Sequence, residues 1–158
     1  MRSLPRPIIQ HGFTLVELVV TVAVLAIIVT LSIPSFRQLI EAQRMRAAAF
    51  DIVADLVLAR SEALKRGTAV TLTPSADGWA NGWSVVAGAE EISKKNRVGG
   101  GVAFTAAPGS VTFNGVGRVS SSVNVVRFAL ETSDASRKRC ISLDPSGRPK
   151  STTTACPS

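Results

Sequence analysis

The stretch FTLVELVVTVAVLAIIVTLSI, residues 13–33, decides how the rest of this chain can fold. It contains one charged residue, Glu17, and as an α-helix its residues rise about 30 Å, enough to cross the hydrocarbon core of a bilayer. Valine and isoleucine are weak helix formers in water. In lipid, however, every backbone polar group must bond internally, so a helix is favoured. The sequence therefore predicts a transmembrane helix near the N-terminus.

Composition argues against several classes of function. The 158 residues suit one domain, and with 46% apolar and 18% charged residues the chain is too apolar to be disordered. The only histidine is His11, and the only cysteines are Cys140 and Cys156, which argues against histidine-based catalysis and against four-ligand zinc sites. No nucleophile has a visible base partner, and we interpret Glu90-Glu91 as a solvated turn. We expect a protein that is not an enzyme and that needs no cofactor or metal.

The residues around the apolar stretch predict its orientation. Residues 1–12 carry Arg2 and Arg6, and the positive-inside rule keeps such a segment in the cytoplasm. The residues after 33 would then lie outside, in an oxidising compartment that permits disulfides. Because two cysteines offer one intramolecular pairing, we expect a Cys140–Cys156 disulfide, with two free buried thiols as the alternative.

Glu17 does not fit a simple membrane helix. A carboxylate in such a segment costs roughly 2.5–3.5 kcal/mol on insertion scales. Glu17 lies near the start of the stretch, so one interpretation is an interfacial glutamate whose side chain reaches water. The other is a partner inside the membrane, such as the N-terminal amine of a neighbouring subunit, which requires a cut just before residue 13. An ordinary signal peptide would be cut after the stretch, but residues 31–34 are a poor cleavage site.

The hexapeptide GFTLVE, residues 12–17, followed by the apolar stretch, resembles the class III signal of type IV prepilins and pseudopilins. The resemblance implies that residues 1–12 are a leader peptide, that a prepilin peptidase cuts between Gly12 and Phe13, and that Phe13 becomes N-methylated. It also implies that Glu17 pairs with the N-terminal amine of an adjacent subunit during filament assembly. The implied protein is a single-pass inner-membrane protein with its head in the periplasm. It then joins other major and minor pilins in an extracellular pilus or a periplasmic pseudopilus.

The rest of the chain predicts an amphipathic helix and a β-rich head. We expect Pro34 to kink or locally break the helix, after which apolar residues recur every three or four positions through residues 34–66. Gly67 is a natural stop. Residues 67–158 alternate short β-branched runs with turn residues, so the fold class is α+β, one long N-terminal helix packed against an antiparallel sheet. The predicted strands are 68–73, 83–87, 102–105, 110–113, 124–131 and 138–144, with a turn at 74–78 and a loop marked by residues 94–97 and 99–101.

Three segments resemble the GspH/FimT branch of minor pilins and pseudopilins. Residues 77–86 resemble its tryptophan-containing hairpin, and we expect Trp79 and Trp83 to pack in the core rather than stack on a ligand. Residues 113–119 resemble the turn before its last strands, and residues 139–150 resemble its C-terminal hairpin. The resemblance implies a minor pilin that enters a type IV pilus, helps to initiate it and lies at or near its tip. The alternative in this branch is a pseudopilin of type II secretion.

Basic residues gather at the C-terminal end, where residues 118–158 have a formal net charge of +4. A solvated surface is the plain interpretation, and contact with an acidic neighbouring subunit or with DNA is the functional one. Residues 147–150 resemble the GRxR motif of DNA-binding minor pilins that act in natural transformation, with lysine in place of the second arginine. The candidate residues for binding double-stranded DNA are Arg137, Lys138, Arg139, Arg148 and Lys150.

Overall fold

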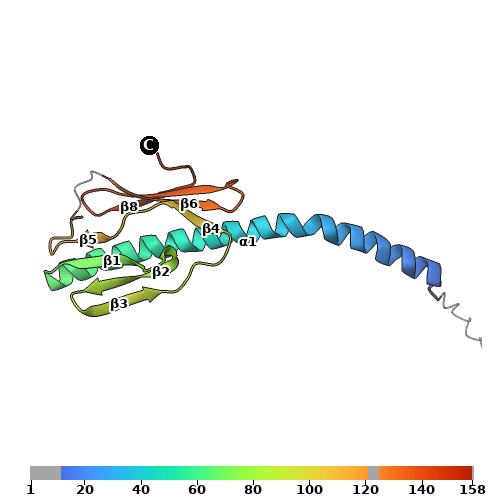
Figure 1. The fold of residues 1–158 in the computed structure, drawn as a ribbon, viewed down its shortest axis with the longest axis horizontal. Coiled ribbons are helices and arrows are strands. Elements are labelled where there is room, and N and C mark those ends of the chain that lie inside the picture. The colour runs from blue at the N-terminus through green and yellow to red at the C-terminus, as the bar shows by residue number, and fades with distance from the viewer. Residues whose placement is uncertain (1–11, 121–124, 158) are drawn as a thin grey trace, which may run out of the picture. The chain divides into compact units, whose positions relative to one another are not determined.

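The computed structural model describes residues 12–120 and 125–157, in two compact units that divide between Arg37 and Gln38. Helix α1 (Leu15–Arg66) runs through both units, and all strands lie in the second unit, here called the head (Figure 1). The strands are β1 (Val70–Ser75), β2 (Gly78–Ala87), β3 (Glu90–Lys95), β4 (Val102–Ala106), β5 (Val111–Phe113), β6 (Val126–Thr132), β7 (Lys138–Leu143) and β8 (Pro149–Thr152). The predicted fold class is confirmed.

Helix α1 ends at the predicted residue, begins two residues after the predicted start, and is continuous through Pro34. Pro34 lies inside the helix. Its ring nitrogen carries no hydrogen, so one i to i−4 bond is missing. The sequence predicts a kink or a local break here, and the local break is wrong because the helix continues on both sides of Pro34. The helix stops where expected, because Gly67 has a left-handed φ of 64°.

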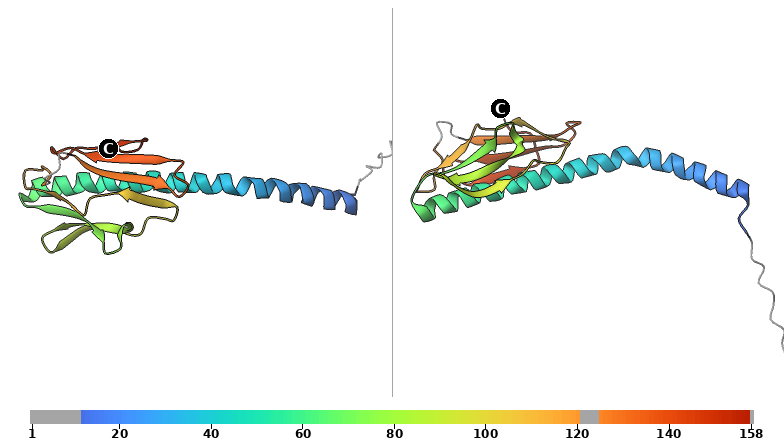
Figure 2. Two further views of the ribbon diagram at one scale, coloured as in Figure 1. Left: turned by 45° about the horizontal axis from the view of Figure 1, so that its top comes forward. Right: turned by 60° about the horizontal axis from the view of Figure 1, so that its bottom comes forward.

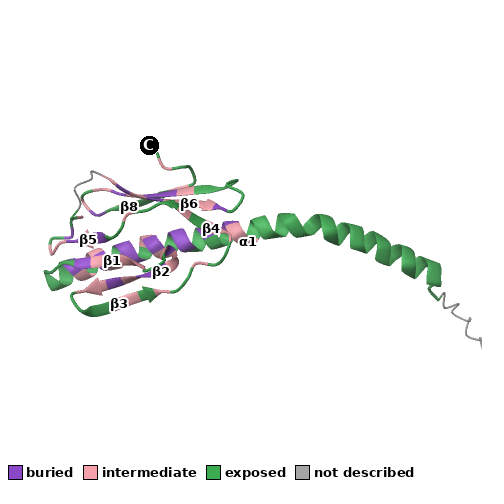
Figure 3. Ribbon diagram, viewed as in Figure 1, coloured by how far each residue is buried: buried purple, intermediate pink, exposed green. Residues whose placement is uncertain are grey.

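The strands form two antiparallel sheets of four strands rather than the single sheet expected. Their orders are β3-β2-β1-β5 and β4-β6-β7-β8. Figures 1 and 2 show both sheets lying along the head part of α1. The two sheets and this part of the helix share one apolar core, which includes Ile52 and Leu56 of α1, Leu72 of β1 and Phe128 of β6. Buried alanines on α1 let the sheets approach the helix closely (Figure 3).

The two tryptophans hold this core together, as expected from the sequence. Trp79 and Trp83 of β2 are only 6% and 3% exposed. Trp79 meets Phe128 of β6 edge to face with ring centroids 4.9 Å apart, so it joins the two sheets. The indole Nε1 of Trp83 donates a hydrogen bond of 2.8 Å to the buried carboxylate of Asp55, so it joins β2 to the helix.

Several predicted strand boundaries are wrong. Residues 74 and 75 belong to β1 and not to a turn, and β2 begins five residues before the predicted start. Glu90 and Glu91, interpreted as a turn, begin β3, and Lys94 and Lys95, interpreted as a loop, end it. β3 is an edge strand whose charged side chains protect its free side, so its sequence lacks an apolar alternation. β8 was not predicted as a strand, and residue 124, the predicted start of β6, lies outside the described residues.

Candidate functional site

Helix α1 begins with a capping arrangement at the proposed processing site. Thr14 precedes the helix, and its Oγ1 accepts a hydrogen bond of 3.2 Å from the backbone N–H of Glu17. The residue types at 14 and 17 are those of a capping box, so Glu17 stands in the first helical turn, where a carboxylate also favours the helix dipole. The sequence analysis did not identify this cap, which Thr14 provides through the backbone N–H of Glu17.

The apolar stretch lacks any cover from the described parts of the chain. Phe13 is 75% exposed, and the large apolar side chains from Leu15 to Ile33 are all exposed (Figure 3). By length and composition α1 contains one segment able to cross a membrane, and that window is unburied throughout. An uncovered apolar surface of this size needs a membrane or neighbouring apolar helices around it.

Gly12 lies in open space. A Cβ atom at this position would meet no described atom within 4 Å. The fold therefore has no steric need for glycine immediately before Phe13.

Strand register divides the five candidate DNA-binding residues into two groups. Lys138 and Arg139 stand at the start of β7, with Arg137 just before them, whereas Lys150 pairs with Ser142 further along β7. Arg148 lies just beyond, in the turn that connects β7 to β8. The structure does not bring the five residues into one cluster.

Arg127, which the sequence analysis did not select, belongs with the second group. It pairs with Ser142 of β7, which in turn pairs with Lys150 of β8. Residues paired across strands project to the same face of a sheet. Their neighbours Val126 and Phe128 are buried in the core, so Arg127 and Lys150 lie on the outer face. Only the register, which the sequence does not supply, could have identified Arg127.

The turn that carries Arg148 is organised by Asp144. The carboxylate of Asp144 accepts hydrogen bonds from the hydroxyl of Ser146 (2.6 Å) and from the backbone N–H of Arg148 (3.0 Å). These bonds lower the pKa of Asp144, and the bond from Ser146 has the largest effect. The Arg148 side chain is 75% exposed and lies 3.6 Å from the same carboxylate. It therefore projects from a firmly built turn, with part of its charge balanced.

Two members of the first group, Arg137 and Arg139, lie on the side of the sheet toward α1. Arg139 lies two residues before the buried Ile141 in β7, so both side chains project from the same face of the sheet. The Nη1 of Arg139 donates a hydrogen bond of 3.2 Å to the Ser151 hydroxyl of β8. Lys138 lies on the opposite face, where its Nζ is 3.0 Å from Glu131. Arg137 and Arg139 line a hollow together with Arg46 of α1, which the sequence analysis also missed.

The predicted disulfide is present. Cys140 of β7 and Cys156 are bonded, with their Cα atoms 4.9 Å apart. Cys140 lies two residues before Ser142 in β7, so its side chain also projects from the outer face of the sheet. The disulfide therefore holds the tail after β8 on that outer face. Within residues 12–120 and 125–157, no three His, Cys, Asp or Glu side chains group in a way that would hold a metal ion.

The comparisons with known proteins agree with these features. The family model for type II transport protein GspH matches residues 48–147, and the model for the prokaryotic N-terminal methylation motif matches residues 9–33. The chain therefore belongs to the GspH family. Among curated proteins, none matches the chain significantly.

Solved structures share the fold. The type IV minor pilin FimU of Pseudomonas aeruginosa is 23% identical in one crystal form, with a TM-score of 0.62 over 75% of this chain and 96% of that chain. A second crystal form of FimU is 25% identical, with a TM-score of 0.58 over 72% and 98%. The minor pseudopilin EpsH from the type 2 secretion system of Vibrio cholerae is 12% identical, with a TM-score of 0.50 over 70% and 97%.

Family, motif and fold together define a minor pilin or pseudopilin of the type IV pilus or type II secretion kind. The methylation motif implies processing by a prepilin peptidase and assembly with other pilins.

Proposed function

We propose that this chain is a structural subunit, a minor pilin that enters a type IV pilus, helps to initiate it and lies at or near its tip. One observation carries the proposal. A carboxylate, Glu17, stands in the first turn of an uncovered apolar helix that begins shortly after the Gly12-Phe13 bond. The initiating role and the tip position rest on the resemblance to minor pilins.

The chemistry of the N-terminus explains why cleavage and assembly belong together. Residues 13–33 contain no lysine or arginine, so Glu17 has no basic partner within its own apolar stretch. Cutting after Gly12 creates an amine at Phe13, at nearly the same depth in the membrane as Glu17 of a neighbouring subunit. Pairing the two charges offsets the cost of keeping each in apolar surroundings, and it sets the stagger between adjacent helices.

The requirement for glycine at the cut is expected to come from the peptidase, since the fold leaves that position open. Before assembly the apolar stretch would hold the chain in the inner membrane with the head in the periplasm. The Cys140–Cys156 disulfide suits that oxidising side.

The proposal is tested by replacing Glu17 with alanine or valine in the full chain. Membrane insertion should persist, because the change makes the helix more apolar, while the amount in sheared pili should fall. The matched control is Thr21→Val in the same helix, since the Thr21 hydroxyl donates only to a carbonyl of its own helix. Pilus incorporation of the Glu17 variants equal to that of the control would overturn the proposed ion pair.

Cleavage is tested by mass spectrometry of the mature N-terminus. A methylated Phe13 is expected, and Gly12→Leu should leave a precursor that retains residues 1–12. A mature N-terminus found after residue 32 would overturn the filament function.

A type II secretion pseudopilin shares every feature named so far, so the host machinery has to be identified. Affinity capture of the cross-linked native complex distinguishes the two systems. Recovery of secretion-system components without pilus components would replace the pilus assignment.

A second candidate function is DNA binding in natural transformation, favoured by one observation. Arg127, Arg148 and Lys150 lie at one end of the β6-β7-β8 sheet, with Arg127 and Lys150 in register on its outer face. Such a surface would neutralise phosphates and bind DNA with strong salt dependence and little sequence preference.

Titration of head residues 38–158 with double-stranded DNA at several salt concentrations tests this candidate. Arg148→Ala/Lys150→Ala should abolish binding, whereas Lys94→Ala/Arg97→Ala removes the same charge elsewhere and should not. No binding at low salt would remove the DNA function and leave the pilin function intact.

A further inference from the structure

A groove runs along the head between α1 and the β7–β8 hairpin. It consists of two hollows of about 550 Å³ and 280 Å³ that share Arg46 and Arg139 in their linings. We call it the α1–β7 groove. It is formed wholly by head residues, which contain the entire core.

One half of the groove is basic. Its lining includes Arg46, Arg137, Lys138 and Arg139 and contains no carboxylate. Lys138 is paired with Glu131, but none of the three arginines forms an ion pair with a carboxylate in the described parts of the chain. The Nε of Arg139 is buried and has no hydrogen-bond partner among the described residues. Three guanidinium groups that line one hollow, one of them with a buried and unpaired Nε, favour an anionic ligand there.

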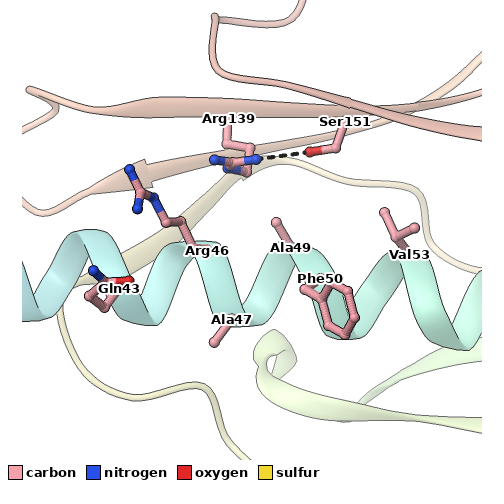
Figure 4. A pocket seen from close by; sticks show the side chains of 8 residues that line it. All are labelled: Gln43, Arg46, Ala47, Ala49, Phe50, Val53, Arg139 and Ser151. Carbon is pink, nitrogen blue, oxygen red and sulfur yellow. Dashed lines mark hydrogen bonds between the residues drawn. The ribbon is translucent and has the colours of Figure 1, made fainter.

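The other half is apolar. Figure 4 shows Arg46 and Arg139 toward one end of this hollow and Phe50 and Val53 toward the other. Phe50 is 73% exposed although it lies on the helix that forms the core. An exposed aromatic ring next to unpaired arginines is the composition typical of the centre of a protein interface.

These observations distinguish between the partners that a basic groove could take. A DNA backbone offers phosphates but nothing apolar for Phe50, and a duplex is too wide to enter a hollow of side-chain size. A second copy of this head is disfavoured, because residues 38–158 contain 15 Lys and Arg against 10 Asp and Glu, a formal net charge of +5. The chemistry that fits both halves is a polypeptide segment with a carboxylate next to an apolar side chain.

We propose that the α1–β7 groove binds an acidic segment of a different pilin subunit in the same filament. This inference rests on the proposed function as a pilin. Carboxylates of that segment bind Arg46, Arg137 and Arg139, and an apolar side chain of the segment packs on Phe50 and Val53. The free edge of β8 borders the groove at Ser151, so an extended segment could add its backbone hydrogen bonds there.

Site-specific photo-crosslinking in the host cell tests the proposal on the full chain. A benzoylphenylalanine at Gln43, which is exposed and lines the groove, should crosslink to another pilin subunit at a segment containing Asp or Glu. Arg46→Glu/Arg137→Glu should lower the crosslink yield about tenfold or more, because charge-assisted bonds are replaced by repulsion. Both arginines are exposed, so the fold should persist, which the melting temperature of the head fragment checks.

Two controls make the result specific. Arg148→Glu/Lys150→Glu reverses the same number of charges outside the groove, in the β7–β8 turn and on the outer face, and should leave the crosslink unchanged. Changing the crosslinked acidic residues of the partner to lysine should restore the yield with the Arg46→Glu/Arg137→Glu chain. A crosslink that does not respond to charge reversal, that joins two copies of this chain, or that captures lipid or DNA would overturn the proposal, as would the absence of any crosslink.

The filament assay separates this proposal from the proposed function. A chain that enters sheared pili normally but shows no charge-dependent crosslink refutes only the groove. A chain that never enters pili but gives the predicted crosslink refutes the pilus function and keeps the groove.

Discussion

Removing the carboxylate of Asp55 is expected to destabilise the head more than any other single polar change on α1. Asp55 is 4% exposed and accepts hydrogen bonds from the indole Nε1 of Trp83 (2.8 Å) and from the hydroxyl of Ser93 (3.1 Å). Asp55→Ala leaves both donors unpaired, the first of them in a side chain that is 3% exposed.

The size of the effect can be worked out from these contacts. A hydrogen bond to a charged group contributes about 1.5–3 kcal/mol, and an orphaned buried donor costs a similar amount. Alanine recovers about 0.5 kcal/mol through its better helix propensity. We therefore expect Asp55→Ala to lower the free energy of unfolding by about 3 kcal/mol, and Asp55→Asn, which keeps an acceptor for the indole, by about 1 kcal/mol.

The assay is urea unfolding of residues 38–158 with the disulfide intact, followed by tryptophan fluorescence, since both tryptophans lie in the core. Asp51→Ala is the matched control. Asp51 lies one turn earlier on α1 and pairs with Lys95 at 3.2 Å, but both side chains are 39% exposed. Such a pair contributes less than about 1 kcal/mol.

Equal losses for Asp51→Ala and Asp55→Ala would refute the reasoning, because burial would then have no influence on the cost. A double-mutant cycle of Asp55→Asn with Trp83→Phe should also give a coupling energy of roughly 0.5–3 kcal/mol. A coupling energy near zero would show that the 2.8 Å bond does not contribute to stability.

Three further predictions concern the sheet that contains β6, β7 and β8, together with its turns and its disulfide. Cys140→Ser/Cys156→Ser should lower the free energy of unfolding by about 3 kcal/mol, because the unfolded chain regains the entropy that closing a loop of about 15 residues removes. A urea midpoint equal to that of the wild type would contradict this prediction. Gly147→Ala should lower the melting temperature of the head more than Gly88→Ala does. Both glycines have a positive φ, but a Cβ atom at residue 147 would lie 2.7 Å from a backbone oxygen, whereas a Cβ atom at residue 88 would meet nothing within 4 Å. Equal melting temperatures for the two variants would contradict the steric argument. Hydrogen bonds to the Asp134 carboxylate, of which the bond from the Thr132 hydroxyl has the largest effect, lower the pKa of Asp134 from its ordinary 3.8 to about 2. The ionised Asp134 carboxylate therefore stabilises the head fully above pH 3.8, and this contribution is lost as the pH falls toward 2. The difference in free energy of unfolding between the wild type and Asp134→Asn should shrink over that pH range. A difference that stays constant would refute the assignment.

The N-terminal part of the molecule was predictable because its determinants are local. The GFTLVE motif, the apolar stretch and the stop at Gly67 are each read within a few residues, and helix propensity in lipid depends on nothing further away. The same holds for the disulfide, since two cysteines allow one intramolecular pair.

The strands were less predictable where the environment, not the sequence, determines the structure. β3 has the composition of a solvated loop, and it is a strand because β2 supplies hydrogen-bond partners along one edge. The short β8 is a strand because a turn organised by Asp144 returns the chain onto β7. Neither cause can be seen in the local pattern.

The candidate surfaces show the same division. The sequence by itself determined that this is a chain with a class III signal, one apolar helix, a covered amphipathic helix and a basic C-terminal end. It could not tell which basic residues act together, because that depends on strand register and on the packing of β7 against α1. Tertiary structure places Arg127 and Lys150 on either side of Ser142 in the sheet. It also brings Arg46 and Arg139 to one hollow, although about 90 residues separate them in the chain. Charge is a property of composition, but a binding surface is a property of contact between distant segments, so only the folded chain could decide it.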